Sequence, residues 1–320
     1  MPRKTREERI EAWTARIQPS VAYCTHCQPK DEGEVLWVLG NKISVGDLLA
    51  DFRVPEDIQD TVAEGLVCNW CGEGEFSTYD DIGLLTAEEK AYNKRHRALT
   101  EKYAPKIRQF GDFLSQYPYL GGAHPLGREI RRMVAKYKAT RIEPATWWRA
   151  RRAEGAVRFG ARDMRPPSKR RAVSEGRFNH FGQRVFYLSA DPETALAETL
   201  DCQRKEVLGW VQRFRMPAVS DVLDLIGPDW YDEEQVPLLA LGLLSHMDNL
   251  APPHDSPWKP EYFVPRYIAD CARESGFKAI RFRSTRAWGV NLVLFDWDSR
   301  APRPVGKPES RVFVPKEPEF

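Results

Sequence analysis

The feature that most constrains the fold is the segment from Gly176 to Glu198, which is expected to form a strand followed by a helix. Val185–Leu188 is a short β-branched and aromatic run, which is typical of a buried strand. The pair Asp191-Pro192 follows it and suits a helix cap and a first helical position. Arg177 precedes the strand, and Glu198 lies about two turns into the helix. A cation and a carboxylate at the two ends of one unit suit a ligand with a negative phosphate end and a reaction centre that becomes positive.

Two further blocks in the same half of the chain combine arginine with aromatic or small residues. Residues 147–151 read Trp-Trp-Arg-Ala-Arg, and residues 280–292 contain Ser284 at the end of one expected strand and Asn291 at the start of the next. In order and spacing, these two blocks and the segment 176–198 resemble the RES domain, a family named for its Arg, Glu and Ser. The resemblance extends over about half of the chain.

The resemblance implies a fold related to the ADP-ribosyltransferase toxins, with NAD+ as the substrate. The activities that it implies are NAD+ phosphorylase or NAD+ glycohydrolase and, in some members, transfer of ADP-ribose to a protein. Cleavage of the bond between nicotinamide and ribose passes through an oxocarbenium-like ribose. A fixed carboxylate stabilises that positive charge, and arginines are bidentate donors to a pyrophosphate. We therefore interpret the chain as an NAD+-consuming enzyme, the bacterial toxin of a toxin–antitoxin system or an effector of phage defence.

The resemblance also indicates which residues form the site. The catalytic candidates are a basic, an acidic and a hydroxyl residue, and the substrate-binding candidates are basic, aromatic and amide residues: Arg149, Glu198 and Ser284 for catalysis, and Arg177, Tyr187, Asn291 and Arg151 for binding. Arg151 could take the role of Arg149, which could instead be a surface ion-pair partner. Arg177 is interpreted as a phosphate or ribose contact, with a structural role as the alternative.

The remaining candidates also have structural alternatives. Tyr187 either stacks on nicotinamide or fills the core, and Asn291 either orients a ribose or amide or satisfies backbone groups. Ser284 either binds the ligand or caps a turn at the end of its strand. Phe159 stands near the place where the family has a recurrent tyrosine.

Positive charge is concentrated around this predicted site. Residues 149–184 contain ten Arg and one Lys against three acidic residues, an excess of eight positive charges, although the whole chain of 320 residues has a net charge of only +2. Such an excess suits either a phosphate-bearing ligand or a nucleic acid. Aromatic residues that would stack on bases are sparse among these arginines, so we do not expect a nucleic-acid partner.

The six cysteines divide into a paired group and two single thiols. The paired group forms two Cys-x-x-Cys motifs with 40 residues between them, and its members are Cys24, Cys27, Cys68 and Cys71. Gly72 permits the tight turn that hydrogen bonds from amides to sulfur need. Four such thiolates suit a tetrahedral Zn2+ site, which is structural because no ligand position stays open. Two redox pairs or reduced thiols are the alternative. His26 is expected to be a bystander, and Cys202 and Cys271 are expected to be buried thiols.

The first 140 residues are predicted to form a mainly helical domain. Helices are expected over residues 6–17, from Ser44, from the capping-box pattern Thr86–Glu89 through Tyr103, over 110–117 and over 126–137. This half resembles, more loosely, the Cys-paired helical domains that precede some RES domains and are related to the HEPN superfamily. HEPN ribonucleases carry an Arg and a His with four to six residues between them, and none of the six histidines here follows an Arg in that way. We therefore predict a scaffold or partner-binding domain rather than RNA cleavage.

The second half alternates strand and helix signals without a regular spacing. Strands are expected at 185–188, 210–215, 222–225, 279–282 and 290–296, and helices after Asp191, at 233–247 and at 262–273. Strands without regular β-α-β spacing favour an α+β fold over a doubly wound sheet. We predict a helical zinc-binding domain at 1–140, an ADP-ribosyltransferase-like RES domain at 141–300 and an extended tail at 301–320.

Several other classes of function have no support in the sequence. The chain contains no Gly-x-Gly-x-x-Gly, Walker A or Gly-x-Ser-x-Gly motif, so the corresponding nucleotide and hydrolase sites are not expected. The N-terminus carries charges and no apolar run, and the longest apolar stretch, 238–244, is too short to cross a bilayer. We therefore expect a cytoplasmic protein without membrane contact.

The expected partners are NAD+, inorganic phosphate, an antitoxin protein and further copies of this chain in a homo-oligomer. Two alternatives remain for the activity. One is a protein ADP-ribosyltransferase that uses the same residues, and the other is a non-catalytic binding module stabilised by zinc.

Overall fold

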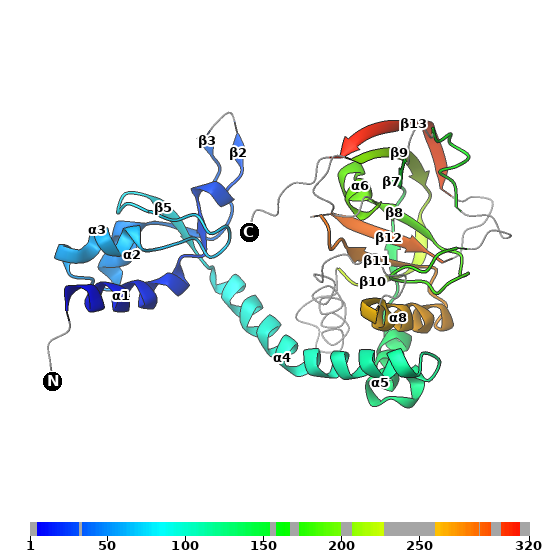
Figure 1. The fold of residues 1–320 in the computed structure, drawn as a ribbon, viewed down its shortest axis with the longest axis horizontal. Coiled ribbons are helices and arrows are strands. Elements are labelled where there is room, and N and C mark those ends of the chain that lie inside the picture. Colours follow the sequence, from blue (N-terminus) through cyan, green and yellow to red (C-terminus); the bar gives the residue numbers. More distant parts are fainter. Residues whose placement is uncertain are drawn as a thin grey trace. The chain divides into compact units, whose positions relative to one another are not determined.

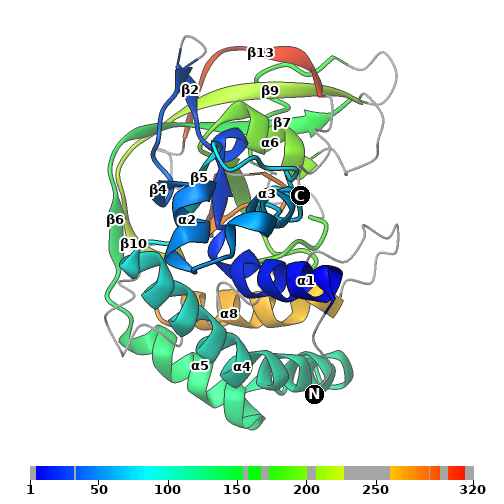
Figure 2. The same cartoon turned by 90° about the vertical axis from the view of Figure 1, so that its left-hand side faces the viewer.

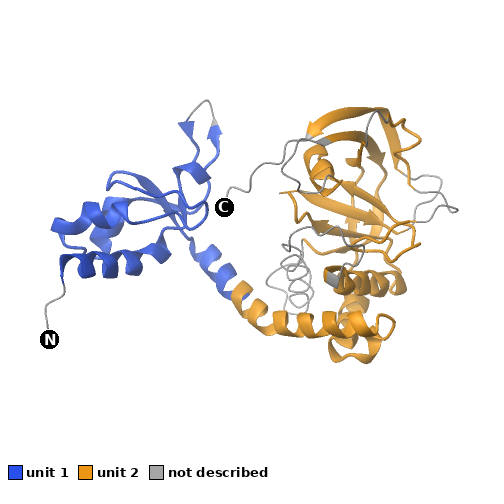
Figure 3. Cartoon of the chain, viewed as in Figure 1, with its two compact units in different colours: residues 1–95, 316–320 blue, residues 96–315 orange. Residues whose placement is uncertain are grey.

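The computed structural model describes residues 5–31, 34–153, 158–166, 173–199, 207–226, 260–287, 289–295 and 302–313. These residues belong to two compact units, one formed by residues 1–95 with 316–320 and the other by residues 96–315 (Figure 3). The helix expected at 233–247 and Cys202 lie outside the described residues. No helix in the described part of the chain is both long and apolar enough to cross a membrane.

The first unit combines helices with small antiparallel sheets (Figure 1). Its helices are α1 (Arg6–Ile17), α2 (Val45–Asp51), α3 (Gln59–Glu64) and the start of α4 (Ala87–Gln116), with short 3-10 turns at Gln18–Ser20, Thr25–Cys27 and Glu56–Ile58. Its strands are β1 (Tyr23–Cys24), β2 (Lys30–Asp31), β3 (Glu34–Val35), β4 (Asn41–Ser44) and β5 (Asp81–Leu84). The strands pair in the order β1-β5-β4, with β2 and β3 as a separate pair.

The helices of the first unit begin where the sequence provides caps. Thr5 Oγ1 accepts a hydrogen bond from Glu8 N at 3.2 Å, and Thr5 N donates to Glu8 Oε2 at 2.8 Å, so α1 has a complete capping box. The same reciprocal pair joins Thr86 and Glu89 at the start of α4. Ser44 caps α2. These starts confirm the sequence predictions because a cap is a local signal.

The strands of the first unit were not predicted. β1 is two residues long, and β4 and β5 are four residues long. Runs this short hold too few residues to show an alternating pattern. They are stabilised by packing, since Ile82 of β5 is fully buried in a core that it shares with helix residues such as Leu49 and Val62.

Helix α4 continues past the predicted end at Tyr103 and contains Pro105 in its interior. Proline removes one intrahelical hydrogen bond and disfavours a helix interior. The buried residues Tyr103, Ile107, Phe110 and Leu114 recur on one face at helical spacing, and their burial offsets that cost. The segments predicted as two helices are therefore one.

The second unit is built around one mixed sheet. Its strands are β6 (Thr140–Ile142), β7 (Ala145–Arg152), β8 (Phe186–Ser189), β9 (Val207–Met216), β10 (Val219–Asp224), β11 (Ala279–Arg283), β12 (Val290–Leu294) and β13 (Arg303–Phe313). Its helices are the rest of α4, α5 (Pro125–Lys136), α6 (Pro192–Thr199) and α8 (Phe263–Glu274), with 3-10 turns at Gly121–Ala123 and Pro260–Tyr262. The mixed content confirms the predicted α+β class.

The sheet has the order β13-β9-β7-β8-β12-β11-β10-β6. Only β10 and β11 run parallel among these described pairs. Helices α5 and α8 lie on the same side of the sheet, away from β13 (Figure 1, Figure 2). Their apolar faces share a core with α4 and with β11 and β12, in which Phe110, Ile130, Ile268 and Ile280 are fully buried.

This shared core explains why the division of the chain differs from the predicted one near residue 140. The second half of α4 and all of α5 pack against α8 and the sheet, so they belong to the second unit. The predicted tail 301–320 also contains β13, which pairs antiparallel with β9. An edge strand tolerates prolines such as Pro304 because its outer N–H groups need no partner.

Gly127 is required where α5 meets the preceding turn. A Cβ atom at this position would lie 1.9 Å from the backbone oxygen of Gly121 and 3.1 Å from the Phe110 ring. We expect Gly127→Ala to lower the free energy of unfolding by about 1–3 kcal/mol, measured by chemical denaturation. Gly111→Ala in α4 is the matched control, since its Cβ would meet no atom within 4 Å and should stabilise the helix by about 0.5–1 kcal/mol. Equal effects of the two changes would contradict this packing.

Candidate functional site

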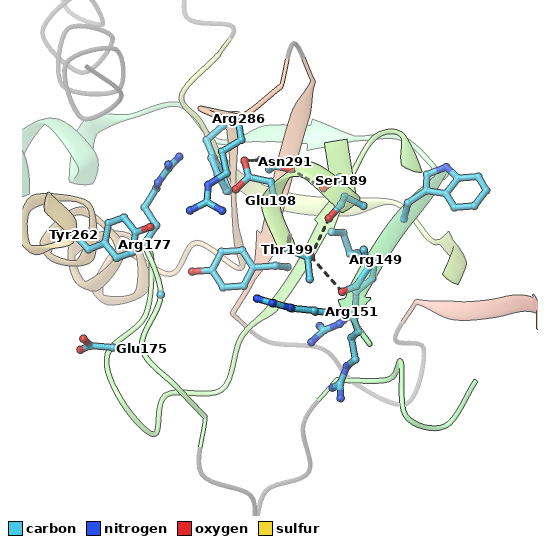
Figure 4. Close-up of a pocket in the computed structure, with 18 of the residues that line it drawn as sticks. Arg149, Arg151, Glu175, Arg177, Ser189, Glu198, Thr199, Tyr262, Arg286 and Asn291 are labelled. Atoms are coloured by element: carbon cyan, nitrogen blue, oxygen red, sulfur yellow. Dashed lines mark hydrogen bonds between the residues drawn. The ribbon is translucent and has the colours of Figure 1, made fainter. Parts of the chain in front are cut away.

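The candidate site lies where β7 and β8 separate. These two strands share a single residue pair, Trp148 with Ser189, whereas β9 follows β7 from Ala145 to Arg152. A pocket of about 630 Å³ is present at this point, within the range of about 300–1,000 Å³ typical of small-molecule sites (Figure 4). The residues that line it are Trp148, Arg149, Ala150, Arg151, Arg152, Phe159, Glu175, Gly176, Arg177, Tyr187, Leu188, Ser189, Ala195, Glu198, Thr199, Tyr262, Phe282, Arg286 and Asn291.

The structure brings all seven predicted site residues together. Those that line the pocket are Arg149, Arg151, Arg177, Tyr187, Glu198 and Asn291. Ser284 lies directly behind the lining, in contact with Glu198. In Figure 4, Arg177 and Tyr262 lie on one side of the pocket, Arg149 and Arg151 on the other, and Glu198 between them.

Glu198 is presented by α6, whose start follows the sequence prediction. Asp191 Oδ1 accepts a hydrogen bond from Thr194 N at 2.7 Å, so the aspartate caps the helix, and Pro192 occupies its first position. Glu193 is exposed in the first turn and pairs with Arg311 at 3.3 Å, outside the pocket. The helix therefore carries Glu198, and not Glu193, into the site.

The carboxylate of Glu198 is held by two donors on one oxygen. Ser284 Oγ donates to Oε1 at 2.6 Å, and Asn291 Nδ2 donates to the same atom at 2.7 Å. No described residue donates a hydrogen bond to Oε2. Charge-assisted hydrogen bonds of this kind are short and strong, so they fix the orientation of the carboxylate and leave Oε2 for a ligand.

Ser284 is itself fixed by a turn between β11 and β12. Its Oγ accepts hydrogen bonds from Arg286 N and Ala287 N, both at 3.0 Å, and its N–H donates to Gly289 O at 2.9 Å. A Cβ atom at Gly289 would lie 1.9 Å from Thr194 Oγ1 in α6. A glycine is therefore needed for this turn to approach the helix that carries Glu198. The serine therefore caps the turn, as one of its two interpretations predicted, and its hydroxyl contacts the carboxylate of Glu198. Its binding of a ligand stays a prediction.

Tyr187 connects the pocket wall to the loop that carries Arg177. Its hydroxyl accepts a hydrogen bond from Phe178 N at 2.9 Å and donates to Asn179 Oδ1 at 3.1 Å. Burial raises the pKa of Tyr187 above its ordinary value, so the phenol stays a neutral donor. A Cβ atom at Gly176 would lie 2.9 Å from this hydroxyl, which is why a glycine starts the loop.

Arg177 is only 8% exposed. Its Nη2 donates to Thr285 Oγ1 at 2.6 Å, its guanidinium carbon lies 5.6 Å from the centre of the Phe282 ring, and its Nη1 is buried without a hydrogen-bond partner in the described structure. The loop is anchored behind it, because Arg266 of α8 donates to Gly176 O at 3.0 Å. A buried N–H without a partner is costly, so this nitrogen is suited to an anion.

On the opposite side of the pocket, Arg149 also has buried guanidinium nitrogens without hydrogen-bond partners among the described residues. These nitrogens are Nε and Nη1, and the guanidinium lies over Phe186 at 4.8 Å. Burial, with a smaller effect of the nearby Arg151 charge, lowers the pKa of Arg149 to about 9. Arg151 lies 5.9 Å from the Phe159 ring. A bound anion would relieve the cost of this uncompensated charge.

Other residues of the site had no assigned role in the sequence prediction. They are Ser189, Arg286, Tyr262, Phe282, Thr199 and Glu175. Ser189 and Arg286 lie inside segments that the motifs cover, so their position in the sequence was a usable signal. Tyr262 directly precedes α8, which is distant in sequence from the motifs, and nothing local indicates that it reaches the pocket.

The first unit contains a second cluster, formed by the four paired cysteines. The sulfurs of Cys24, Cys27, Cys68 and Cys71 all lie within 4.8 Å of one another, and three of their separations are 3.8, 3.5 and 3.5 Å. Two sulfurs bound at about 2.3 Å in a tetrahedron would be about 3.8 Å apart, so this donor set fits a four-coordinate metal. All four cysteines are free of disulfides.

The surroundings of the cysteine cluster agree with two details of the prediction. Gly72 has φ +81°, which a glycine adopts without strain. His26 lies outside the cluster and its Nδ1 is 3.0 Å from Glu73 Oε2. Cys271 of α8 is buried, as expected, and is not part of the cluster.

Comparison with known proteins gives one family match. A family model described as "RES domain" matches residues 146–314. Among solved structures, the chain is similar to a chain of the "Crystal structure of the M.tuberculosis MbcT-MbcA toxin-antitoxin complex", with a TM-score of 0.37 and 14% identity, over 58% of this chain and 92% of that chain. A search of curated proteins found no match.

The unpaired nitrogens of Arg149 predict a response to anions. Inorganic phosphate at about 100 times its dissociation constant should stabilise the wild-type protein by about 2.7 kcal/mol, seen as a rise in Tm. Arg149→Met should abolish most of this rise, and without anion it should be at least as stable as the wild type, because an uncompensated buried charge is lost. Arg132→Met, which removes an exposed arginine of α5, is the control and should keep the rise. An unchanged rise in Arg149→Met would exclude Arg149 as an anion-binding residue.

Proposed function

The chain belongs to the RES domain family, and we propose that it consumes NAD+ by cleaving the bond between nicotinamide and ribose. One observation supports the proposal above the others: a carboxylate with one oxygen held by two donors lies between Arg149 and Arg177, two arginines that each have a buried nitrogen without a hydrogen-bond partner in the described structure. A dinucleotide with a negative pyrophosphate and a ribose that becomes positive matches this distribution of charge.

In the proposed reaction, Glu198 lies beside the ribose that bears nicotinamide. The C1′–N bond breaks, its electron pair leaves with nicotinamide, and the ribose acquires oxocarbenium character. Oε2 of Glu198 faces this positive charge or holds a ribose hydroxyl, while Ser284 and Asn291 keep the carboxylate in place. Arg177 contacts the pyrophosphate, and Tyr187 forms the wall on which the nicotinamide ring stacks.

The arrangement of arginines favours inorganic phosphate as the acceptor. NAD+ carries one pyrophosphate, yet buried nitrogens without partners occur on Arg177 at one side of the pocket and on Arg149 at the other. We propose that Arg149, with Arg151 beside it, holds the attacking phosphate, whose oxygen bonds to C1′ as nicotinamide leaves. The products are nicotinamide and ADP-ribose 1″-phosphate. Water in the same position would make the enzyme a glycohydrolase, and a protein side chain would make it an ADP-ribosyltransferase.

Depletion of NAD+ would make such an enzyme a toxin for the cell that produces it. We therefore propose a role as the toxin of a toxin–antitoxin system or as a defence effector, with an antitoxin protein as the partner that restrains it. The RES family membership supports this role. We also propose that the fold of the second unit, with its sheet around the pocket, is related to that of the ADP-ribosyltransferase toxins.

The products of the reaction test the proposed function. Purified protein is incubated with NAD+ with and without inorganic phosphate, and the products are identified by mass. We expect ADP-ribose 1″-phosphate and nicotinamide, with a rate that rises with phosphate. Free ADP-ribose at a rate independent of phosphate would replace the phosphorylase with a glycohydrolase, and a mass increase of a protein would indicate ADP-ribosylation. Intact NAD+ under all conditions would overturn the proposed function.

Two variants assayed in the same way separate chemistry from binding. Glu198→Gln keeps the shape of the side chain and removes its charge, so kcat should fall by about two orders of magnitude or more with little change in KM. Arg177→Ala removes a contact to the pyrophosphate that is present before and during the reaction, so KM should rise instead. Modest and equal increases of KM in both variants, with kcat unchanged, would contradict the assignment of Glu198.

For the first unit we propose a structural Zn2+ site formed by Cys24, Cys27, Cys68 and Cys71. The support is the close approach of the four sulfurs. Four thiolates would fill all four positions of a tetrahedral zinc site, so no position would remain for water or a substrate. When bound, the ion would connect the segment around β1 to the turn at Cys68–Gly72. It would lie in the first unit and take no part in the NAD+ reaction.

Metal analysis tests the zinc proposal. Freshly purified protein should contain one zinc per chain, and Cys68→Ser should lose it and unfold the first unit at lower denaturant, since metal affinity in such sites of about 10–16 kcal/mol is folding free energy. Cys271→Ala is the control, because Cys271 is a buried thiol outside the cluster and its removal should leave the zinc content unchanged. Protein without zinc and with four titratable thiols would refute the site.

A further inference from the structure

Asn291 lies between Glu198 and Ser189, and Ser189 has no role in the mechanism described so far. Ser189 Oγ donates to Asn291 Oδ1 at 2.7 Å, and Asn291 Nδ2 donates to Glu198 Oε1 at 2.7 Å. The three side chains therefore form a chain of two hydrogen bonds from β8 through β12 to α6 (Figure 4).

The backbone places Ser189 and Asn291 opposite each other. They are register partners in the antiparallel pair of β8 and β12, and both are buried, at 5% and 3% exposure. Directly opposed side chains in an antiparallel pair lie about 5 Å apart at Cβ, which suits a serine hydroxyl bound to an amide. Ser189 is also the residue that pairs with Trp148 at the single contact between β7 and β8. Its position is therefore fixed from both neighbouring strands.

The chemistry of the three groups permits only one orientation of the amide. An ionised carboxylate accepts hydrogen bonds and donates none, so Glu198 requires the NH2 end of Asn291. The carbonyl end then faces Ser189, whose hydroxyl is able to donate. Without that hydroxyl, the carbonyl oxygen of Asn291 would be buried without a donor, and the amide would rotate toward another donor or water.

We propose that Ser189 is a positioning residue that fixes the amide of Asn291 and, through it, the orientation of the Glu198 carboxylate. This inference rests on the proposed function, in which Oε2 of Glu198 acts on the ribose. Ser284 alone fixes Oε1 at one point and leaves rotation about that hydrogen bond. The second donor, Asn291, removes this rotation, and Ser189 holds the second donor.

The test compares Ser189→Ala with the wild type in steady-state nicotinamide release. A catalytic carboxylate displaced by a fraction of an ångström loses transition-state stabilisation, so kcat should fall by about tenfold or more, with KM changed less than about twofold. In the background of Asn291→Ala, the same change should have no further effect on kcat, because the path to Glu198 is already broken. Ser220→Ala removes an exposed hydroxyl from β10 and should leave kcat unchanged.

Three kinetic results would overturn the inference. One is an unchanged kcat in Ser189→Ala, and another is an equal further loss of kcat in the Asn291→Ala background, which would show that Ser189 does not act through Asn291. A rise in KM without a fall in kcat would indicate a substrate contact and would also overturn it.

A crystal structure of Ser189→Ala separates this inference from the proposed function. If the wild-type protein does not consume NAD+, the proposed function fails, and the structure alone decides the positioning. We expect Asn291 Nδ2 to lie beyond hydrogen-bond distance of Glu198 Oε1, or the carboxylate to be rotated. An unchanged arrangement of Asn291 and Glu198 would overturn the role of Ser189 whatever the activity of the protein.

Discussion

The separation of β7 from β8 after one residue pair is the constraint on which the site depends. Strand β7 leaves β8 beyond Trp148 but stays paired with β9 over its whole length, so its backbone groups on the β9 side keep partners while side chains from both strands line the pocket. Helix α6 packs against β7 through Ala150 and Leu196 and places Glu198 at the same gap.

At this gap, buried nitrogens of positively charged side chains have no hydrogen-bond partners in the described structure, which lowers stability. Arg149 and Arg177 keep buried nitrogens without hydrogen-bond partners among the described residues, although each guanidinium lies against an aromatic ring. Contact with a ring offsets only part of the loss of hydration. Residues that lower stability and line a pocket are characteristic of binding sites, where a ligand supplies the missing partner. The same side chains would be difficult to explain as parts of a purely structural core.

The sequence predicted the local parts of this arrangement well. The strand before Ser189, the Asp191 cap and the carboxylate of Glu198 lie within one short segment, so near-neighbour rules were sufficient. The grouping of Arg149 and Ser284 with that segment came from the family resemblance and not from local rules. The continuation of α4 through Pro105 and the pairing of β13 with β9 were missed, because packing and long-range pairing decide them. Ser189 was visible in the sequence but had no role until its partner on β12 was known.

The carboxylate of Glu198 and the guanidinium of Arg177 are held in place by different kinds of element. Glu198 lies on a helix, Ser284 at a strand end and Asn291 on a strand, and both Ser284 and Asn291 donate a hydrogen bond to Glu198. Arg177 lies on a loop that α8 holds through bonds from Arg266 to Gly176 O and from Arg273 to Phe178 O. A group that acts on a transition state needs a fixed direction, whereas a group that contacts a phosphate with several equivalent oxygens tolerates small movements. The carboxylate thus comes from a helix and is held by residues of two neighbouring strands, whereas Arg177, the proposed phosphate contact, comes from a loop, as expected if the two groups contribute to turnover and affinity separately.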